Sequence, residues 1–362
     1  MHFLKSPKNL WLLAGVSLVL KVLFFLYLKL FHEGQLFGGG NDSNYYNAYA
    51  LGDVDNAVNL WPVILRFLNE IGLYNRELLS HVLFVTSVAL MPYLYYKLVK
   101  DRDYSNKLVK SGAVFLIVYY PAIFFLTIDV YRDVFMFTVF LLTLWIYKTM
   151  LEARGVIGGI YFIVFLSLAF FLFLLRPYLG TALALTPFVY IIFLKTKRYI
   201  RTWIFLYLVA LVLAKASGLI DPILLYRDKD VFNHGGSSLG IGLLNTDSLM
   251  FIIYYLYSLF VQLFGLFFVS FNAILVFILE SVPFILAFFY IFKNIKFMTK
   301  FASFLLVFFV IYTTVWVLGN DNLGTAVRLR VPSYLVIFAC MFIVYQEKSK
   351  LFYVNKINRG LK

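Results

Sequence analysis

Apolar runs long enough to cross a bilayer recur through the sequence from Leu10 to Tyr345, and only short polar breaks separate them. A membrane helix needs roughly 20 consecutive apolar residues, because the hydrocarbon core of a bilayer is about 30 Å thick. The 362 residues are 62% hydrophobic and 14% charged, which is more apolar surface than a water-soluble core can bury. We therefore expect an all-α polytopic membrane protein with a single membrane domain over residues 1–362.

The positions of the basic residues predict the orientation, because Lys and Arg collect in cytoplasmic loops. Most of the 32 basic residues lie in six segments, 5–8, 97–110, 148–154, 195–201, 293–300 and 348–362. These segments are predicted to be cytoplasmic, so the net charge of +14 does not indicate a nucleic-acid partner. Most of the acidic residues lie on the other, outer side. Nine basic residues remain there: Arg66, Arg76, Arg132, Arg176, Lys215, Arg227, Lys229, Arg328 and Arg330.

This orientation predicts ten membrane crossings with both chain ends in the cytoplasm. The crossings are expected near residues 10–31, 78–97, 108–128, 132–150, 156–175, 178–195, 202–219, 270–292, 301–318 and 331–346. The first run has no small-residue cleavage site, which favours an uncleaved span over a signal peptide. The apolar stretch 249–268 is predicted to be a re-entrant or interfacial helix, since an eleventh crossing would place the basic C-terminal tail outside.

Polar residues gather at four outer places, which we expect to converge: the first loop 32–77, the break 129–133, the loop 219–248 and the segment 319–330. In the first loop, a glycine run leads to Asp42 and Tyr45 at the start of a short helix. Asp42 is the leading catalytic candidate, and Tyr45 is a candidate substrate contact. Asp42 could instead only cap that helix, as Asp, Asn and Ser often do. The sequel, 57–73, has apolar residues at helical spacing and predicts an amphipathic interfacial helix.

The break between the third and fourth spans places three charges within five residues, Asp129, Arg132 and Asp133. Charges at the end of a span must face a cavity, water or a partner. Asp129 and Asp133 are further catalytic candidates and Arg132 a phosphate-binding one, with an ion pair at a helix end as the alternative. Arg176, beside a Pro and a Gly in a tight outer turn, could reach a lipid phosphate or merely extend to the membrane surface.

Arg328 and Arg330 precede the last predicted span and suggest a phosphate clamp, because a guanidinium group offers a planar fork of donors to phosphate oxygens. On a helix the two side chains would diverge, and on an extended segment they would share one side. Glu280 is the one carboxylate at predicted membrane depth and is a functional candidate for that reason, unless it pairs with Lys215 or a tyrosine. The loop that carries His234 could act as a lid over substrate or could be plain solvated surface.

Three of these segments resemble parts of the membrane glycosyltransferases with the GT-C fold, especially bacterial enzymes that build surface polysaccharide. The segments are Gly39–Tyr46, the Arg132-Asp133 break and Gly324–Pro332. The resemblance implies a first outer loop with amphipathic helices, and a bacterial inner-membrane location. It also implies that Asp42 is a general base or helps to bind a divalent metal, and that Asp129 or Asp133 is a second acidic residue. No metal or other cofactor is assigned from the sequence.

An outward-facing site implies a lipid-linked donor, since nucleotide sugars are cytoplasmic. The expected donor is therefore a polyprenyl-phosphate or polyprenyl-diphosphate sugar, and the expected acceptor is a glycan or glycolipid. The nearest alternative is an O-antigen or capsule repeat-unit polymerase, in which Arg176 and Arg328 would matter more than Asp42. A lipid-linked oligosaccharide transporter is a further alternative, although the internal repeats typical of many transporters are not evident in the sequence.

Overall fold

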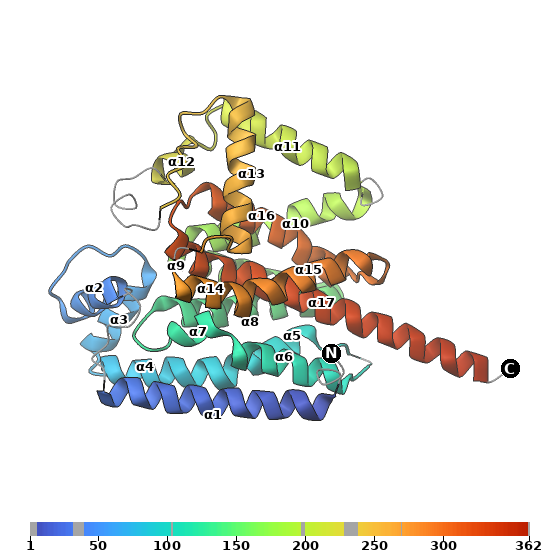
Figure 1. The fold of residues 1–362 in the computed structure, drawn as a ribbon, viewed down its shortest axis with the longest axis horizontal. Coiled ribbons are helices and arrows are strands. Elements are labelled where there is room, and N and C mark those ends of the chain that lie inside the picture. The colour runs from blue at the N-terminus through green and yellow to red at the C-terminus, as the bar shows by residue number, and fades with distance from the viewer. Residues whose placement is uncertain are drawn as a thin grey trace. The chain divides into compact units, whose positions relative to one another are not determined.

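The computed structural model describes residues 6–31, 40–102, 104–196, 200–227, 238–268 and 270–360. Within these ranges the chain is helical and has no strand (Figure 1). An isolated antiparallel bridge joins Ser238 to Asn322. The predicted all-α class is confirmed.

The chain divides into two compact units. The first unit comprises Met1–Thr181, Ile291–Ala302 and Ala339–Lys362, and the second comprises Ala182–Tyr290 and Ser303–Phe338. The single domain expected from sequence thus has two parts, which are described separately below.

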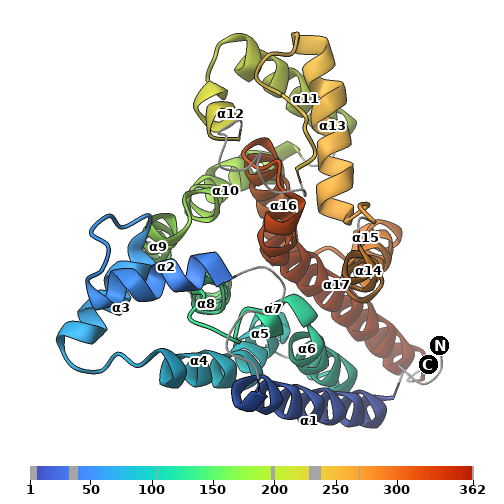
Figure 2. The ribbon, with the colours of Figure 1, turned by 60° about the vertical axis from the view of Figure 1, so that its left-hand side comes forward.

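The first unit contains a layer of long helices and a pair of short ones. Helix α1 packs against α6, which packs against α5, and α8 packs against both α5 and α9, while α2 and α3 form their own pair (Figure 2). The helices are α1 (Pro7–Phe31), α2 (Gly40–Leu51), α3 (Leu60–Glu70), α4 (Arg76–Val85), α5 (Met91–Val99), α6 (Lys107–Tyr119), α7 (Pro121–Phe125), α8 (Arg132–Glu152), α9 (Gly155–Leu175) and the start of α10 (Pro177–Thr196). A π-helical turn, Thr86–Leu90, joins α4 to α5.

Aromatic packing fixes the first unit near the C-terminal end of α1. Phe25 of α1 stacks on Phe84 of α4 with ring centroids 4.4 Å apart, and both pack with Phe124 of α7 in one buried cluster. Large rings at such points bury much apolar area per residue.

Helix α3 begins at the cap Asn59, whose side chain accepts a hydrogen bond from the Trp61 backbone N–H, as expected for a helix N-cap.

The second unit is built from the remaining helices, among which α11 packs against α13. In its core the rings of Phe284 and Tyr334 lie parallel with centroids 4.0 Å apart, and the Tyr207 hydroxyl lies 2.7 Å from the hydroxyls of Tyr255 and Thr314. The helices are α11 (Ile200–Ala216), α12 (Asp221–Arg227), α13 (Ser248–Phe264), α14 (Phe271–Val276) and α15 (Val282–Lys293), with parts of α16 (Lys300–Leu318) and α17 (Leu323–Gly360). A π-helical turn, Phe277–Ser281, joins α14 to α15.

Eight helices in the described ranges are long and apolar enough to cross a membrane, or nine if one bent pair counts as a span. By length and composition the chain is therefore a multi-pass membrane protein. The eight spans are Pro7–Phe31, Arg76–Val99, Arg132–Glu152, Gly155–Leu175, Pro177–Leu194, Phe271–Lys293, Lys300–Leu318 and Leu323–Val354. The predicted count of ten is not confirmed.

Two predicted spans differ from the structure. The segment 108–128 is not one helix, because α6 ends at Tyr119 and Tyr120 leaves the helical conformation before Pro121; a residue before proline disfavours that conformation. The segment 202–219 forms α11, followed by α12 at a bend of 80°. The stretch 249–268 is helical as α13 up to the left-handed cap Gly265, but its re-entrant or interfacial placement stays a prediction.

Helix α17 begins earlier than the sequence indicated. The predicted outer loop 319–330 is helical from Leu323 onward, because the Asn322 side chain accepts a hydrogen bond from the Thr325 N–H at 2.9 Å and caps the helix. Pro332 lies within α17 rather than at its start.

The α9–α10 turn gives a stability prediction. A Cβ atom at Gly180 would overlap the backbone of Phe173, whereas one at Gly159, an exposed position in α9, would meet nothing within 4 Å. We expect Gly180→Ala to destabilise the protein by about 1–3 kcal/mol, as overpacking commonly does, and to lower the unfolding midpoint in detergent. Gly159→Ala is the matched control, and an equal response of the two variants would contradict the packing.

Candidate functional site

Asp42 lies in the first turn of α2 and is half-buried. Its helix is held by one buried face, on which Ser43 and Tyr46 are 0% and 4% exposed. These two residues are three apart, so they share a side of the helix. The predicted short helix is confirmed, and it carries the candidate carboxylate at its N-terminal end.

Asp129 forms a bidentate ion pair with Arg76. The guanidinium donates from Nε and Nη2 to the two carboxylate oxygens at 2.8 and 2.5 Å, and Nη2 also reaches Asn44 Oδ1 at 2.8 Å. Asp129 further accepts from the Val130 N–H at 2.8 Å and from Ser43. Burial alone would raise the pKa of Asp129, but these donors outweigh it and hold the pKa below its ordinary value. Arg76 thus ties α2 to the 129–133 break.

Asp133 forms an ion pair with Arg176. The carboxylate is fully buried, and Arg176 Nη1 lies 3.3 Å from its Oδ1. Arg132, beside it, donates from Nη1 to the Leu175 carbonyl at 3.0 Å. These contacts fix the start of α8 to the α9–α10 turn. The sequence left open an ion pair within this segment; the ion pairs observed instead join Asp133 to Arg176 and Asp129 to Arg76, which lie in other segments.

Tyr46 lies where these groups come together. Burial raises the pKa of its hydroxyl, and the charges of Arg132, Asp42 and Asp133 all act on it. From α3, the Trp61 indole N–H donates to the Val130 carbonyl at 2.8 Å. The first loop and the 129–133 break, two of the four places expected to converge, therefore lie together in the first unit, and the Arg176 turn, which was not among the four, joins them.

Tyr45 closes the connection between α2 and α3. Its hydroxyl donates to the Asn56 carbonyl and accepts from the Val58 N–H at 3.2 Å. This contact gives Tyr45 a role in shaping the loop. The predicted substrate contact by Tyr45 stays a prediction.

In the second unit, Arg227 and Asp321 form the centre of another buried network. Arg227 is 1% exposed, its Nη2 lies 2.5 Å from Asp321 Oδ1, and its Nη1 donates to the carbonyls of Val317 and Asn320 at 2.8 and 2.7 Å. Asp321 also accepts from Ser238. The end of α12 and Ser238 are thereby joined to the segment before α17. His234, a predicted substrate residue, lies outside the described residues.

Glu280 and Arg330 form a buried ion pair, with Arg330 Nη2 3.4 Å from Glu280 Oε2. The π-helical turn Phe277–Ser281 carries the glutamate. Gly265 makes room for the arginine, because a Cβ there would overlap Arg330 Nη1. Lys215 instead pairs with Asp221 at 3.5 Å. The ion pair of Glu280 is therefore with Arg330, whereas Lys215 pairs with another carboxylate.

Arg328 and Arg330 do not lie on the same side of the chain, which the predicted phosphate clamp on an extended segment would require. Both residues lie on α17, where residues two apart point in nearly opposite directions. Arg330 is fully buried, and Arg328 is half-buried. Asp42 belongs to the first unit and these arginines to the second, so a pocket shared by all three stays a prediction.

A divalent metal finds no three-ligand site in the described part of the chain. No group of three or more His, Cys, Asp or Glu residues there is placed to hold an ion. Asp129 and Asp133, which the sequence offered as companions of Asp42, are both occupied by arginines. These residues do not fit a metal, and no catalytic step is assigned to one.

No role was predicted from the sequence for Arg76 and Arg227. Each lies at the centre of a network of ion pairs and hydrogen bonds, Arg76 in the first unit and Arg227 in the second. Both were counted only as basic residues of the outer side. That position was itself a signal, because a cation on the side that Lys and Arg avoid needs a partner.

Comparison with known proteins adds no assignment: the chain matches no protein-family model, no curated protein and no solved structure. The resemblance to GT-C glycosyltransferases therefore stays a prediction.

Acid should weaken the Arg76–Asp129 contact. Because the folded-state pKa of Asp129 is lowered, the stability it contributes is complete above the unfolded-state pKa of about 3.9 and is lost as pH falls through the folded value. We expect Asp129→Asn to be less stable than the wild type at pH 7, with a gap that narrows below about pH 4. Thermal unfolding across pH measures the gap, and a constant gap would contradict the ion pair.

The Glu280–Arg330 pair should show strong coupling. Removing one member of a buried ion pair leaves the other charge without compensation and costs roughly 3–5 kcal/mol. We expect Glu280→Gln and Arg330→Gln each to destabilise strongly and the double variant to lose much less than the sum. Denaturant unfolding of the four proteins measures the coupling. Additive losses would show that the two side chains act independently.

Proposed function

We propose that this protein is an integral membrane glycosyltransferase. It would transfer a sugar from a polyprenyl-linked donor to a surface polysaccharide or glycolipid acceptor on the extracytoplasmic face. The observation that carries the proposal is the position of Asp42, half-buried in the first turn of α2, where its charge and that of Arg132 both act on the Tyr46 hydroxyl. The other two candidate carboxylates, Asp129 and Asp133, form ion pairs with arginines that fix the segments around it.

Asp42 suits the role of general base. A carboxylate fixed by a bidentate arginine has a lowered proton affinity, which makes Asp129 a poor base. Asp42 instead sits at the start of α2, which the Arg76–Asp129 network holds in place through Asn44 and Ser43. In the proposed step, Asp42 accepts the proton of an acceptor hydroxyl, the hydroxyl oxygen bonds to the anomeric carbon of the sugar, and the bond from that carbon to the donor phosphate oxygen breaks.

Arg132 suits the phosphate of the donor. Its Nη1 is used by the Leu175 carbonyl, but its Nε donates to no acceptor among the described residues. A guanidinium group with a remaining donor can stabilise the charge that develops on a leaving phosphate. The donor would be lipid-linked because the site lies on the face predicted to be extracytoplasmic, and its polyprenyl chain would lie among the apolar helices.

The repeat-unit polymerase is the closest alternative, and it relies on Arg176 as a ligand-binding cation. Arg176 is only 6% exposed and is paired with Asp133, so recruiting it would break a buried ion pair. A transporter of lipid-linked sugars would need no general base. Both alternatives therefore predict that Asp42 can lose its basicity without loss of function.

Asp42→Asn tests the proposal. We expect it to slow sugar transfer by a factor of about 100 to 10,000, the usual contribution of a general base, while donor binding persists. The assay incubates purified protein with polyprenyl-phosphate and polyprenyl-diphosphate sugars and measures donor consumption and product. Asp53→Asn is the matched control, because Asp53 is an exposed carboxylate that follows the same helix.

Two outcomes would contradict the proposal. Full transfer activity in Asp42→Asn would exclude Asp42 as the base and favour the polymerase. Binding of the lipid-linked sugars by the wild type without any conversion would favour transport. Thermal unfolding of each variant distinguishes a loss of chemistry from a loss of fold.

A further inference from the structure

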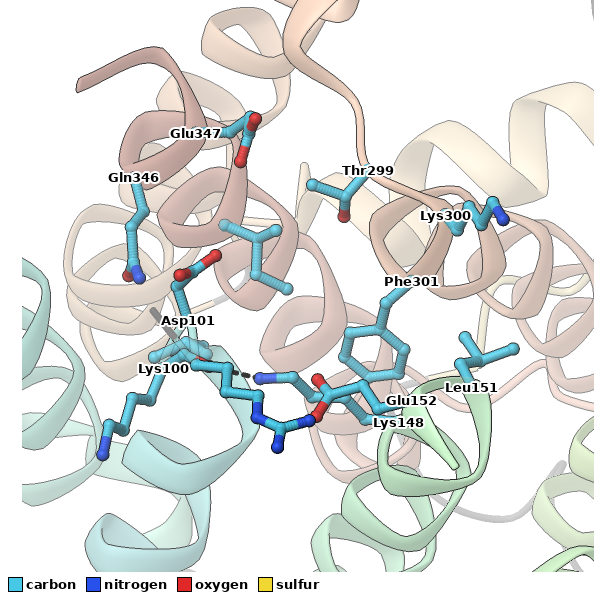
Figure 3. Close-up of a pocket in the computed structure, with 13 residues that line it drawn as sticks. Lys100, Asp101, Lys148, Leu151, Glu152, Thr299, Lys300, Phe301, Gln346 and Glu347 are labelled. Atoms are coloured by element: carbon cyan, nitrogen blue, oxygen red, sulfur yellow. Dashed lines mark hydrogen bonds between the residues drawn. The ribbon is translucent and has the colours of Figure 1, made fainter. Parts of the chain in front are cut away.

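The first unit contains a pocket of about 390 Å³ on the side opposite to the predicted outer face. It lies where α5, α8, α16 and α17 meet, in segments that the basic-residue pattern predicts to be cytoplasmic (Figure 3). Pockets of this size accommodate small ligands. None of the residues discussed for glycosyl transfer lines it, so the inference does not rest on the proposed function.

One wall of the pocket is held in place by Lys148 of α8. Its ammonium group donates to the Leu98 carbonyl at 3.0 Å and to the Lys100 carbonyl. Both carbonyls lie at the C-terminal end of α5, where helices have unsatisfied acceptors. Figure 3 shows this contact, with Glu152 beside it. The segment that follows α5 and contributes Asp101 and Arg102 is thus preorganised.

Charges of both signs line the pocket. The cations are Lys100, Arg102, Lys148 and Lys300, and the anions are Asp101, Glu152 and Glu347. In Figure 3, Asp101 and Glu347 lie on one side, and Lys148 lies across from Glu347. A purely anionic ligand would meet three carboxylates, and a purely cationic ligand would meet four basic groups. A ligand that carries both charges would be complementary to this lining.

Apolar side chains complete the lining. Leu151, Phe301 and Ile343 contribute to the same pocket, and the helices that supply them continue as spans. A ligand with an apolar tail could therefore place its head among the charges and its tail along the helices. Bilayer lipids present both parts at this depth.

We propose that this pocket binds the headgroup of an aminophospholipid, in which a phosphate diester is joined to a primary ammonium. Lys148, which lies across from Glu347, would receive the phosphate together with Arg102 of the lining, since guanidinium and ammonium groups bind its oxygens. Glu347 lies on the side that would receive the ammonium. Asp101 is less suited to it, because it already accepts from the Tyr104 N–H at 2.8 Å and lies 3.5 Å from Lys350.

Headgroup preference tests this proposal directly. Dioctanoyl phosphatidylethanolamine and dioctanoyl phosphatidylglycerol have the same tails and phosphate, but only the first carries an ammonium. We expect the full chain in detergent to bind the ethanolamine lipid about tenfold more tightly, a preference that fits one charge-assisted hydrogen bond. A simple positive surface would prefer the anionic glycerol lipid, so that preference would overturn the proposal.

Two variants test the ammonium contact and the phosphate contact separately. We expect Glu347→Gln to remove the ethanolamine preference while binding of the glycerol lipid stays equal or becomes tighter. Arg102→Gln should weaken both lipids. The controls are Asp53→Asn and Lys107→Gln, which remove the same charges at exposed positions outside the pocket. If each variant behaves as its control does, the proposal is wrong.

A soluble competitor identifies the source of the headgroup. Glycerophosphoethanolamine carries the same zwitterion without tails. We expect it to compete much more weakly than the short-chain lipid, because each buried methylene contributes about a fourfold gain in affinity. Equal competition would support the zwitterion site but assign it to a soluble ligand, and no competition at any concentration would contradict headgroup recognition.

Discussion

A charge at the end of a membrane span is stable only with water or an opposite charge beside it, and this requirement organises the side of the protein that the sequence predicts to be outer. Nine basic residues fall on that predicted side, and ion pairs with carboxylates hold six of them within the described ranges. The pairs are Arg66 with Asp55, Arg76 with Asp129, Arg176 with Asp133, Lys215 with Asp221, Arg227 with Asp321, and Arg330 with Glu280. These basic residues lie on the side where Lys and Arg are scarce, and their main role is to join different segments of the chain.

Most of these pairs connect parts of the chain that are distant in sequence. Arg76 brings α2 to the 129–133 break through Asn44 and Asp129, and Arg227 reaches the segment before α17. An arginine can do this because its donors fan out in one plane, so one side chain satisfies a carboxylate and backbone carbonyls together. Irregular backbone at the ends of spans thereby obtains the hydrogen bonds that lipid cannot supply.

The sequence predicted what depends on local pattern. The length of the apolar runs located α1, α8, α9 and α16 within a few residues, and the glycine run with Asp42 predicted α2. It did not predict the identity of the ion pairs, because a partner such as Asp129 for Arg76 is fixed by folding and not by spacing. The break before Pro121 was readable from the rule for residues that precede proline, but the apolar run on either side outweighed it.

The same distinction bears on which carboxylate could perform chemistry. A carboxylate that anchors a loop is bound by donors that stabilise its charged form, and this lowers its affinity for a proton. Asp129 shows this effect directly, and Asp133 is fully buried against Arg176. A base needs both access to its substrate and a position that other contacts fix. The proposal assigns this role to Asp42, because Ser43 and Tyr46 bury the neighbouring face of α2 while Asp42 itself is half-buried at the helix start. The structural ion pairs of Asp129 and Asp133 thus supply the rigidity on which the proposed role of Asp42 depends.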